Sequence, residues 1–123
     1  MRLYVRGMAS HSSKDLGSLG EDIAVQFLER RGVRIVECNA FVDRDEIDVV
    51  YEIDGRLVAV EVKTSSNGTD PLDALDDTKT RRFQRATNGY RLPISTVDAV
   101  SVVLGSGGVE IRWLREISLG WDP

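Results

Sequence analysis

The fold of this chain is decided by residues 45–64, which read DEIDVVYEIDGRLVAVEVKT. The stretch is typical of a β-hairpin, because an alternating segment at 49–53 and an apolar segment at 57–62 flank the dipeptide Asp54-Gly55. Asp-Gly favours a two-residue type I′ turn, in which both central residues need a positive φ. Such a turn sets the register of the hairpin, with Ile53 facing Arg56.

This register gathers acidic side chains. Counting back from the turn puts Asp48 opposite Glu61, and it puts Glu46 opposite Lys63. Alternation along each strand places these side chains on one face of the sheet. Opposed Cβ atoms lie about 4.5–5.5 Å apart, and like charges placed there repel. We therefore expect a cation to hold Asp48 and Glu61 together. It is either Lys63 alone or a metal ion such as Mg²⁺, which takes one or two carboxylates and keeps several waters.

The spacing of these residues, Asp48-x12-Glu61-x-Lys63, resembles the PD-(D/E)xK nuclease signature without the proline before the aspartate. Short motifs with variable gaps arise by chance in many proteins. The context strengthens this one, because the aspartate lies in one predicted strand and the Glu-Val-Lys run ends the next. The alternative is an amphipathic hairpin whose acids and lysine form a solvated salt-bridge network.

Composition limits the classes of protein to which the chain can belong. Its 123 residues fit one domain with a single core, and 41% hydrophobic with 29% charged residues is typical of a globular protein. The net charge of −4 counts mildly against nucleic-acid binding, for which basic domains are more common. A single cysteine excludes a disulfide framework and a zinc cluster of cysteines. Because no apolar run reaches membrane length and none follows the first basic residues as a signal peptide would, we expect a cytoplasmic protein.

The rest of the chain reads as one α/β domain at 16–117 between a flexible N-terminal tail at 1–15 and a C-terminal tail at 118–123. Periodicity and turn residues predict a helix at 18–31, a strand at 33–39, a turn at 40–45, the hairpin, a helix from 72 or 73 to 92, and strands at 97–104 and 109–114. This order of a helix, three strands, a helix and two strands resembles the restriction-endonuclease-like fold, which implies a mixed sheet flanked by helices.

The first predicted helix carries one acid with two interpretations. Ser18 and Glu21 have the S-x-x-E spacing of a capping box, which would give Glu21 a structural role at the helix start. Glu21 also lies at the edge of the apolar stripe, beside Ala24 and Leu28, where its carboxylate can reach the acids of the hairpin. Gly32 supplies the C-terminal stop of the helix.

The second predicted helix is acidic at its start and basic afterwards, with Arg81, Arg82 and Arg85 in the basic part. Acids at the start and bases towards the end complement the helix dipole. The same arginines also make a basic face suited to phosphates. Both interpretations remain open from the sequence alone.

Lys79 differs from these arginines because it lies within the apolar stripe of the helix, with Leu75, Phe83, Ala86 and Tyr90 as neighbours in the stripe. A lysine in such a stripe either extends its amine to water or reaches an internal acid. If the amine reaches inward, we expect Glu46, Glu61 or a bound phosphate as its partner, because an unpaired buried ammonium is unfavourable.

The last two predicted strands contribute Asp98 and Trp113. Asp98 is either a site residue or an acid at the start of a strand. Trp113 is expected in the core and not as a platform for stacking bases.

At finer grain the chain resembles the YraN family of uncharacterised, endonuclease-like bacterial proteins, which are similar to archaeal Holliday junction resolvases. The matching residues lie between about 17 and 103 and are Gly20-Glu21, Ala24, Phe27-Leu28, Gly32, Asn39, Glu46-Ile47-Asp48, Asp54-Gly55, Val60-Glu61-Val62-Lys63-Thr64, Lys79, Ala86, Tyr90 and Val97-Asp98. Two positions depart from the family. Asp45 replaces the usual glycine and adds a negative charge beside the site. Ala40-Phe41 follows Asn39 where the family has an arginine, which removes one phosphate contact.

The resemblance implies a restriction-endonuclease-like fold and hydrolysis of DNA that depends on Mg²⁺ or Mn²⁺. Asp48 and Glu61 would hold the metal ion, with the Val62 carbonyl as a further ligand. Lys63 would position a metal-bound water or assist its deprotonation. Glu21 would complete the acid cluster for a second ion.

The resemblance also implies accessory roles and partners. Glu46 would pair with Lys63 or orient it, and Lys79 would serve the site from the second helix. The expected partner is DNA, with branched DNA and a homodimer as open options. The alternatives are a non-catalytic module that binds nucleic acid or protein, and a domain with no nucleic-acid role.

Overall fold

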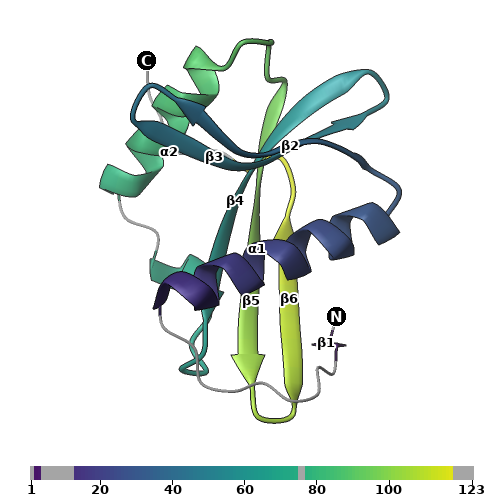
Figure 1. Ribbon diagram of the computed structural model, residues 1–123, viewed down its shortest axis with the longest axis vertical. Coiled ribbons are helices and arrows are strands. Elements are labelled where there is room, and N and C mark those ends of the chain that lie inside the picture. The colour runs from purple at the N-terminus through teal and green to yellow at the C-terminus, as the bar shows by residue number, and fades with distance from the viewer. Residues whose placement is uncertain (1, 4–12, 75–76, 118–123) are drawn as a thin grey trace.

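The computed structural model describes residues 2–3, 13–74 and 77–117 of the chain (Figure 1). Its elements are β1 (Arg2–Leu3), α1 (Ser13–Arg30), β2 (Arg34–Val42), β3 (Asp45–Ile53), β4 (Arg56–Ser65), the 3₁₀ helix η1 (Pro71–Ala74), α2 (Asp77–Gly89), β5 (Thr96–Gly105) and β6 (Gly108–Leu114). Apart from β1 and η1, this is the predicted order of helix, three strands, helix and two strands. The restriction-endonuclease-like α/β fold class is therefore confirmed.

The described strands form one mixed sheet in the order β1-β6-β5-β4-β3-β2. Only β4 and β5 are parallel among them, and the segment that contains η1 and α2 connects these two strands. A parallel pair needs such a crossover because a tight turn can join only antiparallel strands. The parallel pair lies at the centre of the sheet, so β4, which carries Glu61 and Lys63, has a neighbour on each side.

The two long helices cover opposite faces of the sheet (Figure 1). On one face α1 lies across β4 and β5, where its Phe27 and Leu28 pack with the β4 residues Val60 and Val62. On the other face α2 packs on β3, with Phe83 in a separate core. Each fully buried aliphatic or aromatic side chain contributes about 1.5–3 kcal/mol, so these two cores hold the layers together.

The hairpin turn is as predicted. Asp54 and Gly55 have φ values of 51° and 77°, as a two-residue type I′ turn requires. The β3–β4 register runs from Ile53–Arg56 to Val49–Val60. This part of the predicted register is confirmed.

The ladder ends before the acids, however, so the predicted direct pairs Asp48–Glu61 and Glu46–Lys63 are wrong. Beyond Val60 the backbone of β4 meets a side chain of β3 instead, since the Val62 amide donates to Asp48 Oδ2 at 2.8 Å. Like charges directly opposite each other repel, which favours an end of the ladder at this point.

Helix α1 begins at Ser13, so the predicted start at residue 18 and the capping box of Ser18 with Glu21 are wrong. Two glycines in the first turns obscure this start in the sequence, because glycine is a poor helix former. Gly20 has a packing role: a Cβ built there would lie 1.8 Å from Thr64 Oγ1. The glycine thus lets α1 approach β4 next to Lys63. At the other end Gly32, with a φ of 89°, stops the helix as predicted.

The predicted turn at 40–45 is also wrong, because β2 continues to Val42 and only residues 43–44 turn the chain. Asn39 does adopt a left-handed φ of 53°, as a turn residue would. The strand resumes after it because Ala40 and Val42 pack into the core under α2. The strands at 97–104 and 109–114 are confirmed and extend slightly further as β5 and β6.

The predicted helix from residue 72 or 73 to 92 is divided into η1 and the shorter α2, with residues 75–76 outside the described part. The tail predictions fall largely on residues 1, 4–12 and 118–123, which are also outside it, while Arg2–Leu3 pairs with β6. The domain boundaries stay a prediction. Among the described helices, none combines the length and the apolarity that crossing a bilayer requires.

Candidate metal and nucleic-acid site

Three carboxylates from two elements meet beside the end of the β3–β4 ladder. Glu21 comes from α1, and Glu46 and Asp48 come from β3. One oxygen of each lies within 4.8 Å of the others, and all three residues are half-buried. Glu21 therefore reaches the hairpin acids. This contact was predicted by the interpretation of Glu21 as a site residue.

A break in the alternation of β3 explains how these acids meet. Ile47 and Val50 lie three positions apart, yet both pack in the core under α2. Val49, between them, packs in the core under α1. Regular strands alternate faces at every residue. Asp48 thus lies at an irregularity of the sheet, where groups from both faces can approach it.

Asn39 links two of the three acids. Its Nδ2 donates to Glu21 Oε2 at 2.9 Å and to Glu46 Oε1 at 2.6 Å. Its left-handed backbone is one that asparagine tolerates better than most residues. Reasoning from the residues alone assigned Asn39 no role in the site. An asparagine within a predicted strand was the available signal.

The environment of Asp48 opposes its ionisation. Burial, followed by the nearby Glu61 carboxylate, raises the pKa of Asp48 from 3.8 to about 8, although the hydrogen bond from Val62 acts in the opposite direction. Glu21 and Glu46 raise the pKa further. A bound cation would relieve this repulsion and favour the ionised form.

Glu61 and Lys63 form an ion pair, with Nζ 2.8 Å from Oε1. The predicted contact of Glu46 with Lys63 is therefore replaced by one between Lys63 and its own strand neighbour. Val60 and Val62 pack under α1, so the alternation of β4 turns Glu61 and Lys63 towards the α2 side. Asp48 thus lies between Glu21 on one side of the sheet and Glu61 on the other.

The hairpin acids border a groove of about 860 Å³, and arginines that we call the basic wall line the same groove. The groove is lined by Arg44, Asp45, Glu46, Asp48, Glu61, Lys63, Arg81, Arg82, Phe83 and Arg85. Carboxylates form one part and guanidinium groups of α2 and the β2–β3 turn form the other. Arg81 and Arg82 are exposed there, while Arg44 was not singled out from the sequence.

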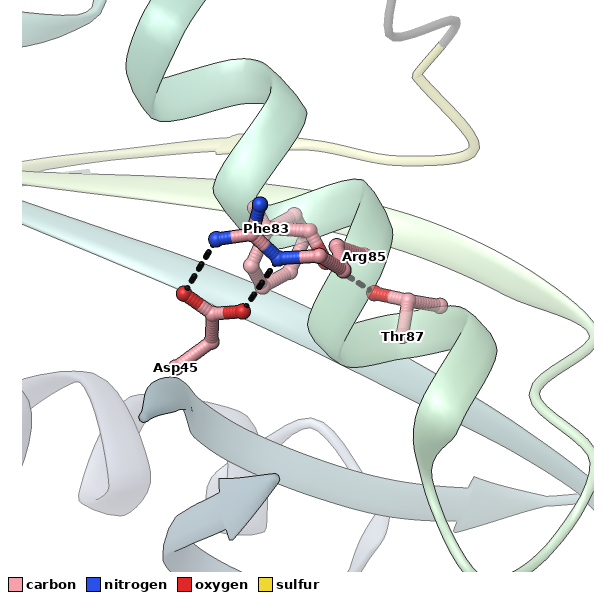
Figure 2. Close-up of polar contacts among 4 residues, drawn as sticks. All are labelled: Asp45, Phe83, Arg85 and Thr87. Carbon is pink, nitrogen blue, oxygen red and sulfur yellow. Dashed lines mark hydrogen bonds and ion pairs between the residues drawn. The ribbon is translucent and has the colours of Figure 1, made fainter. Parts of the chain in front are cut away.

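The third predicted phosphate ligand, Arg85, already has an acidic partner (Figure 2). Its Nε and Nη2 donate to the two oxygens of Asp45 at 2.6 and 2.9 Å. These hydrogen bonds lower the pKa of Asp45 below its ordinary value despite its burial. The extra negative charge expected from Asp45 is therefore buried and paired within the basic wall.

The outcome differs for two other predicted residues, Lys79 and Asp98. The side chain of Lys79 is not among the described parts of the chain, so its accessory role stays a prediction. Asp98 is 1% exposed and accepts hydrogen bonds from the Tyr51 hydroxyl, Trp113 Nε1 and the Glu116 amide. This network gives Asp98 a structural role and keeps Trp113 against the core, as expected.

Known proteins resemble the chain over the region that holds the site. A profile of the uncharacterised protein family UPF0102 matches residues 20–102. A UPF0102 protein of Dictyoglomus thermophilum is 33% identical over 114 residues, which are 83% of this chain and 93% of the relative. One of Flavobacterium psychrophilum is 40% identical over 86 residues, covering 68% and 70% of the two chains. One of Renibacterium salmoninarum is 39% identical over 102 residues, covering 76% and 86%.

Proposed function

The chain belongs to the uncharacterised protein family UPF0102, the YraN family, and we propose that it is a metal-dependent DNA endonuclease. The observation that carries this proposal is the groove, which is lined both by acids of the crowded cluster and by arginines. Acids that hold a cation and arginines that hold phosphates are the two parts that hydrolysis of a phosphodiester needs.

The acid cluster fits a hard divalent cation. Asp48 has a raised pKa among carboxylates, and carboxylate oxygens are ligands that Mg²⁺ and Mn²⁺ prefer. Asp48 and Glu61, with the Val62 carbonyl, would hold one ion, and Glu21 would serve this ion or a second one. A bound ion would supply an activated water and stabilise charge on the phosphate.

The protein groups around the cluster have separate tasks in this proposal. Asn39 holds Glu21 and Glu46 in place. Lys63 borders the groove and can orient a water or stabilise negative charge, and its pairing with Glu61 keeps its ammonium beside the acids. Arg81 and Arg82 would bind backbone phosphates, and Lys79 would assist them.

The substrate and setting belong to the same proposal. We place the activity in the cytoplasm and on DNA, with branched or junction DNA as the preferred substrate. A homodimer would let two such grooves act on two strands of a junction. Because phosphate contacts release counterions, DNA binding should weaken steeply as salt rises.

The test measures binding and cleavage separately. We expect Asp48→Asn and Glu61→Gln to weaken Mn²⁺ binding, measured by calorimetry, at least about tenfold. Mutation of residues that only support the ligands of a metal ion already lowers the affinity by about that factor. Both variants should lose cleavage of branched and flap DNA. Glu52→Gln is the matched control, because Glu52 pairs with Arg34 and is not among the residues that line the groove. Unchanged Mn²⁺ affinity in both site variants would overturn the nuclease proposal.

A second candidate function is a nucleic-acid-binding or protein-binding module without catalysis. Three contacts favour it: Asn39 donates hydrogen bonds to Glu21 and Glu46, and Lys63 forms an ion pair with Glu61. In that case the acids would serve stability alone. DNA binding with no cleavage in Mg²⁺ or Mn²⁺ would support this module over the enzyme.

A further inference from the structure

The two partners in the contact between Asp45 and Arg85 differ strongly in their exposure to solvent. The Asp45 side chain is 7% exposed, whereas that of Arg85 is 55% exposed. Both oxygens of Asp45 accept from one edge of the guanidinium, formed by Nε and Nη2. Figure 2 shows the third nitrogen of Arg85 pointing away from Asp45. One edge of the guanidinium is thus held by a buried acid, and the group as a whole remains accessible from the groove.

The backbone that carries Arg85 is also held firmly. Phe83, two positions earlier in α2, is 4% exposed in the core against β3. The Thr87 hydroxyl donates to the Phe83 carbonyl at 2.8 Å, within the same helical turn (Figure 2). Arg85 therefore extends from a fixed point of α2 to a fixed acid at the start of β3.

Asp45 also acts on the neighbouring arginines. Arg44 and Arg82, which line the same groove, lie close enough to favour the ionised form of Asp45 together with Arg85. Three guanidinium groups brought together would repel one another. A buried carboxylate at their centre offsets that repulsion and lets the basic wall form before any phosphate arrives.

We infer that Asp45 is a positioning residue, which holds Arg85 so that the outer edge of its guanidinium binds a backbone phosphate of DNA. This inference rests on the proposed function, because it names the phosphate contact made in the same groove. A flexible arginine loses rotamer entropy when it is immobilised. In this protein the contact with Asp45 fixes Arg85 in advance, so the phosphate meets an ordered donor.

The charge of Asp45 gives the inference a sharp test. If Asp45 acted through its charge alone, removing that negative charge from the groove would strengthen DNA binding. The positioning role predicts the opposite sign, because Arg85 loses its orientation. At about 0.3 M salt the Debye length falls below 8 Å, so long-range attraction is screened and the contact geometry dominates.

The experiment compares Asp45→Asn with Asp43→Asn. Asp43 is exposed in the neighbouring turn, and asparagine tolerates its φ of 57°. This control therefore removes a second charge that acts on Arg85, but it leaves both hydrogen bonds between Asp45 and Arg85 in place. Binding of a fluorescent DNA duplex is measured in EDTA at 0.1 and 0.3 M NaCl. We expect Asp45→Asn to bind about tenfold more weakly than Asp43→Asn, as the loss of one charged hydrogen bond predicts. Equal or tighter binding by Asp45→Asn would overturn the inference.

Arg85→Lys provides a second measurement should Asp45→Asn fail to fold. Lysine keeps the charge but lacks the planar fork that can bind Asp45 and a phosphate at once. We expect it to bind the duplex about fivefold or more weakly than wild type, and equal binding would overturn the inference.

The proposed function is judged separately from this inference, by whether the wild-type protein binds DNA in EDTA and cleaves it in Mn²⁺. Wild-type activity with no difference between Asp45→Asn and Asp43→Asn rejects the positioning role alone. Absence of both DNA binding and cleavage in the wild type rejects the proposed function and this inference together.

Discussion

Two partly or fully buried aspartates, Asp98 on β5 and Asp48 on β3, illustrate two uses of a carboxylate. Asp98 on β5 accepts hydrogen bonds from Tyr51, Trp113 and the Glu116 amide, so its oxygens are satisfied by donors. Asp48 on β3 accepts one from the Val62 amide and otherwise faces other carboxylates. A buried acid surrounded by donors stabilises a fold, whereas one surrounded by acids favours a proton or a metal ion.

The largest expected effect comes from breaking the satisfied acid. Asp98→Ala leaves two buried donors and a backbone amide without their acceptor, at about 1–3 kcal/mol for each unsatisfied group. We expect the free energy of unfolding to fall by about 4 kcal/mol in urea denaturation. Mn²⁺ affinity of the fraction that remains folded should stay unchanged. A loss of less than 1 kcal/mol would remove the contrast between Asp98 and Asp48.

A smaller loss is expected where α1 meets β4. Gly20→Ala would place a methyl group against Thr64, and such overpacking costs about 1–3 kcal/mol. The shift of α1 should also move Glu21 away from Asp48, so Mn²⁺ affinity should fall together with the melting temperature. Gly17→Ala is the control, because a Cβ at Gly17 meets no atom within 4 Å. Equal behaviour of the two variants would show that the close approach at Gly20 is unnecessary.

The smallest effect has the opposite sign and concerns Asp48. Its folded-state pKa is raised to about 8, so the unfolded state ionises first and stability falls as pH rises from about 4 to 8. Asp48→Asn removes that loss and retains an oxygen for the Val62 amide. In EDTA we expect it to be more stable than wild type by on the order of 1–2 kcal/mol at pH 8.5.

At pH 4.5 the same comparison should show little difference, because Asp48 is then protonated in the folded state and the variant removes no charge. Melting temperatures of both proteins across this pH range check the prediction. With excess Mn²⁺ at pH 8.5 the order should reverse, since the wild type binds the ion more tightly and gains more stability from it. If the difference in melting temperature between the two proteins is the same at every pH, the prediction based on the raised pKa of Asp48 is wrong.

Much of the fold could be predicted because its signals are local. Asp54-Gly55 sets the hairpin turn through positive φ values, Gly32 ends α1, and the apolar periods mark the strands. Errors arose where a local signal competed with packing. Asn39 has the conformation of a turn residue, but burial of the residues after it continues β2. The glycines at the start of α1 weakened the helix pattern, although one of them is required by the approach to β4.

The candidate site was predictable as a set of residue types but not as a set of contacts. Asp48, Glu61, Lys63 and Glu21 were all singled out, and the structure brings them to one region. Their pairing differs from the hairpin register, because the β3–β4 ladder ends at Val49. Lys63 therefore meets Glu61 and not Glu46.

By itself, the sequence determined the hairpin, the order of elements and which acids are candidates for the site, since these depend on neighbours along the chain. Only the tertiary structure decided that Asn39 bridges Glu21 and Glu46, and that Asp45 holds Arg85. The partners in these contacts lie up to 40 positions apart in sequence. Their distances are set by where α1 and α2 cross the sheet, and burial of the two cores fixes those crossings because no local propensity encodes them.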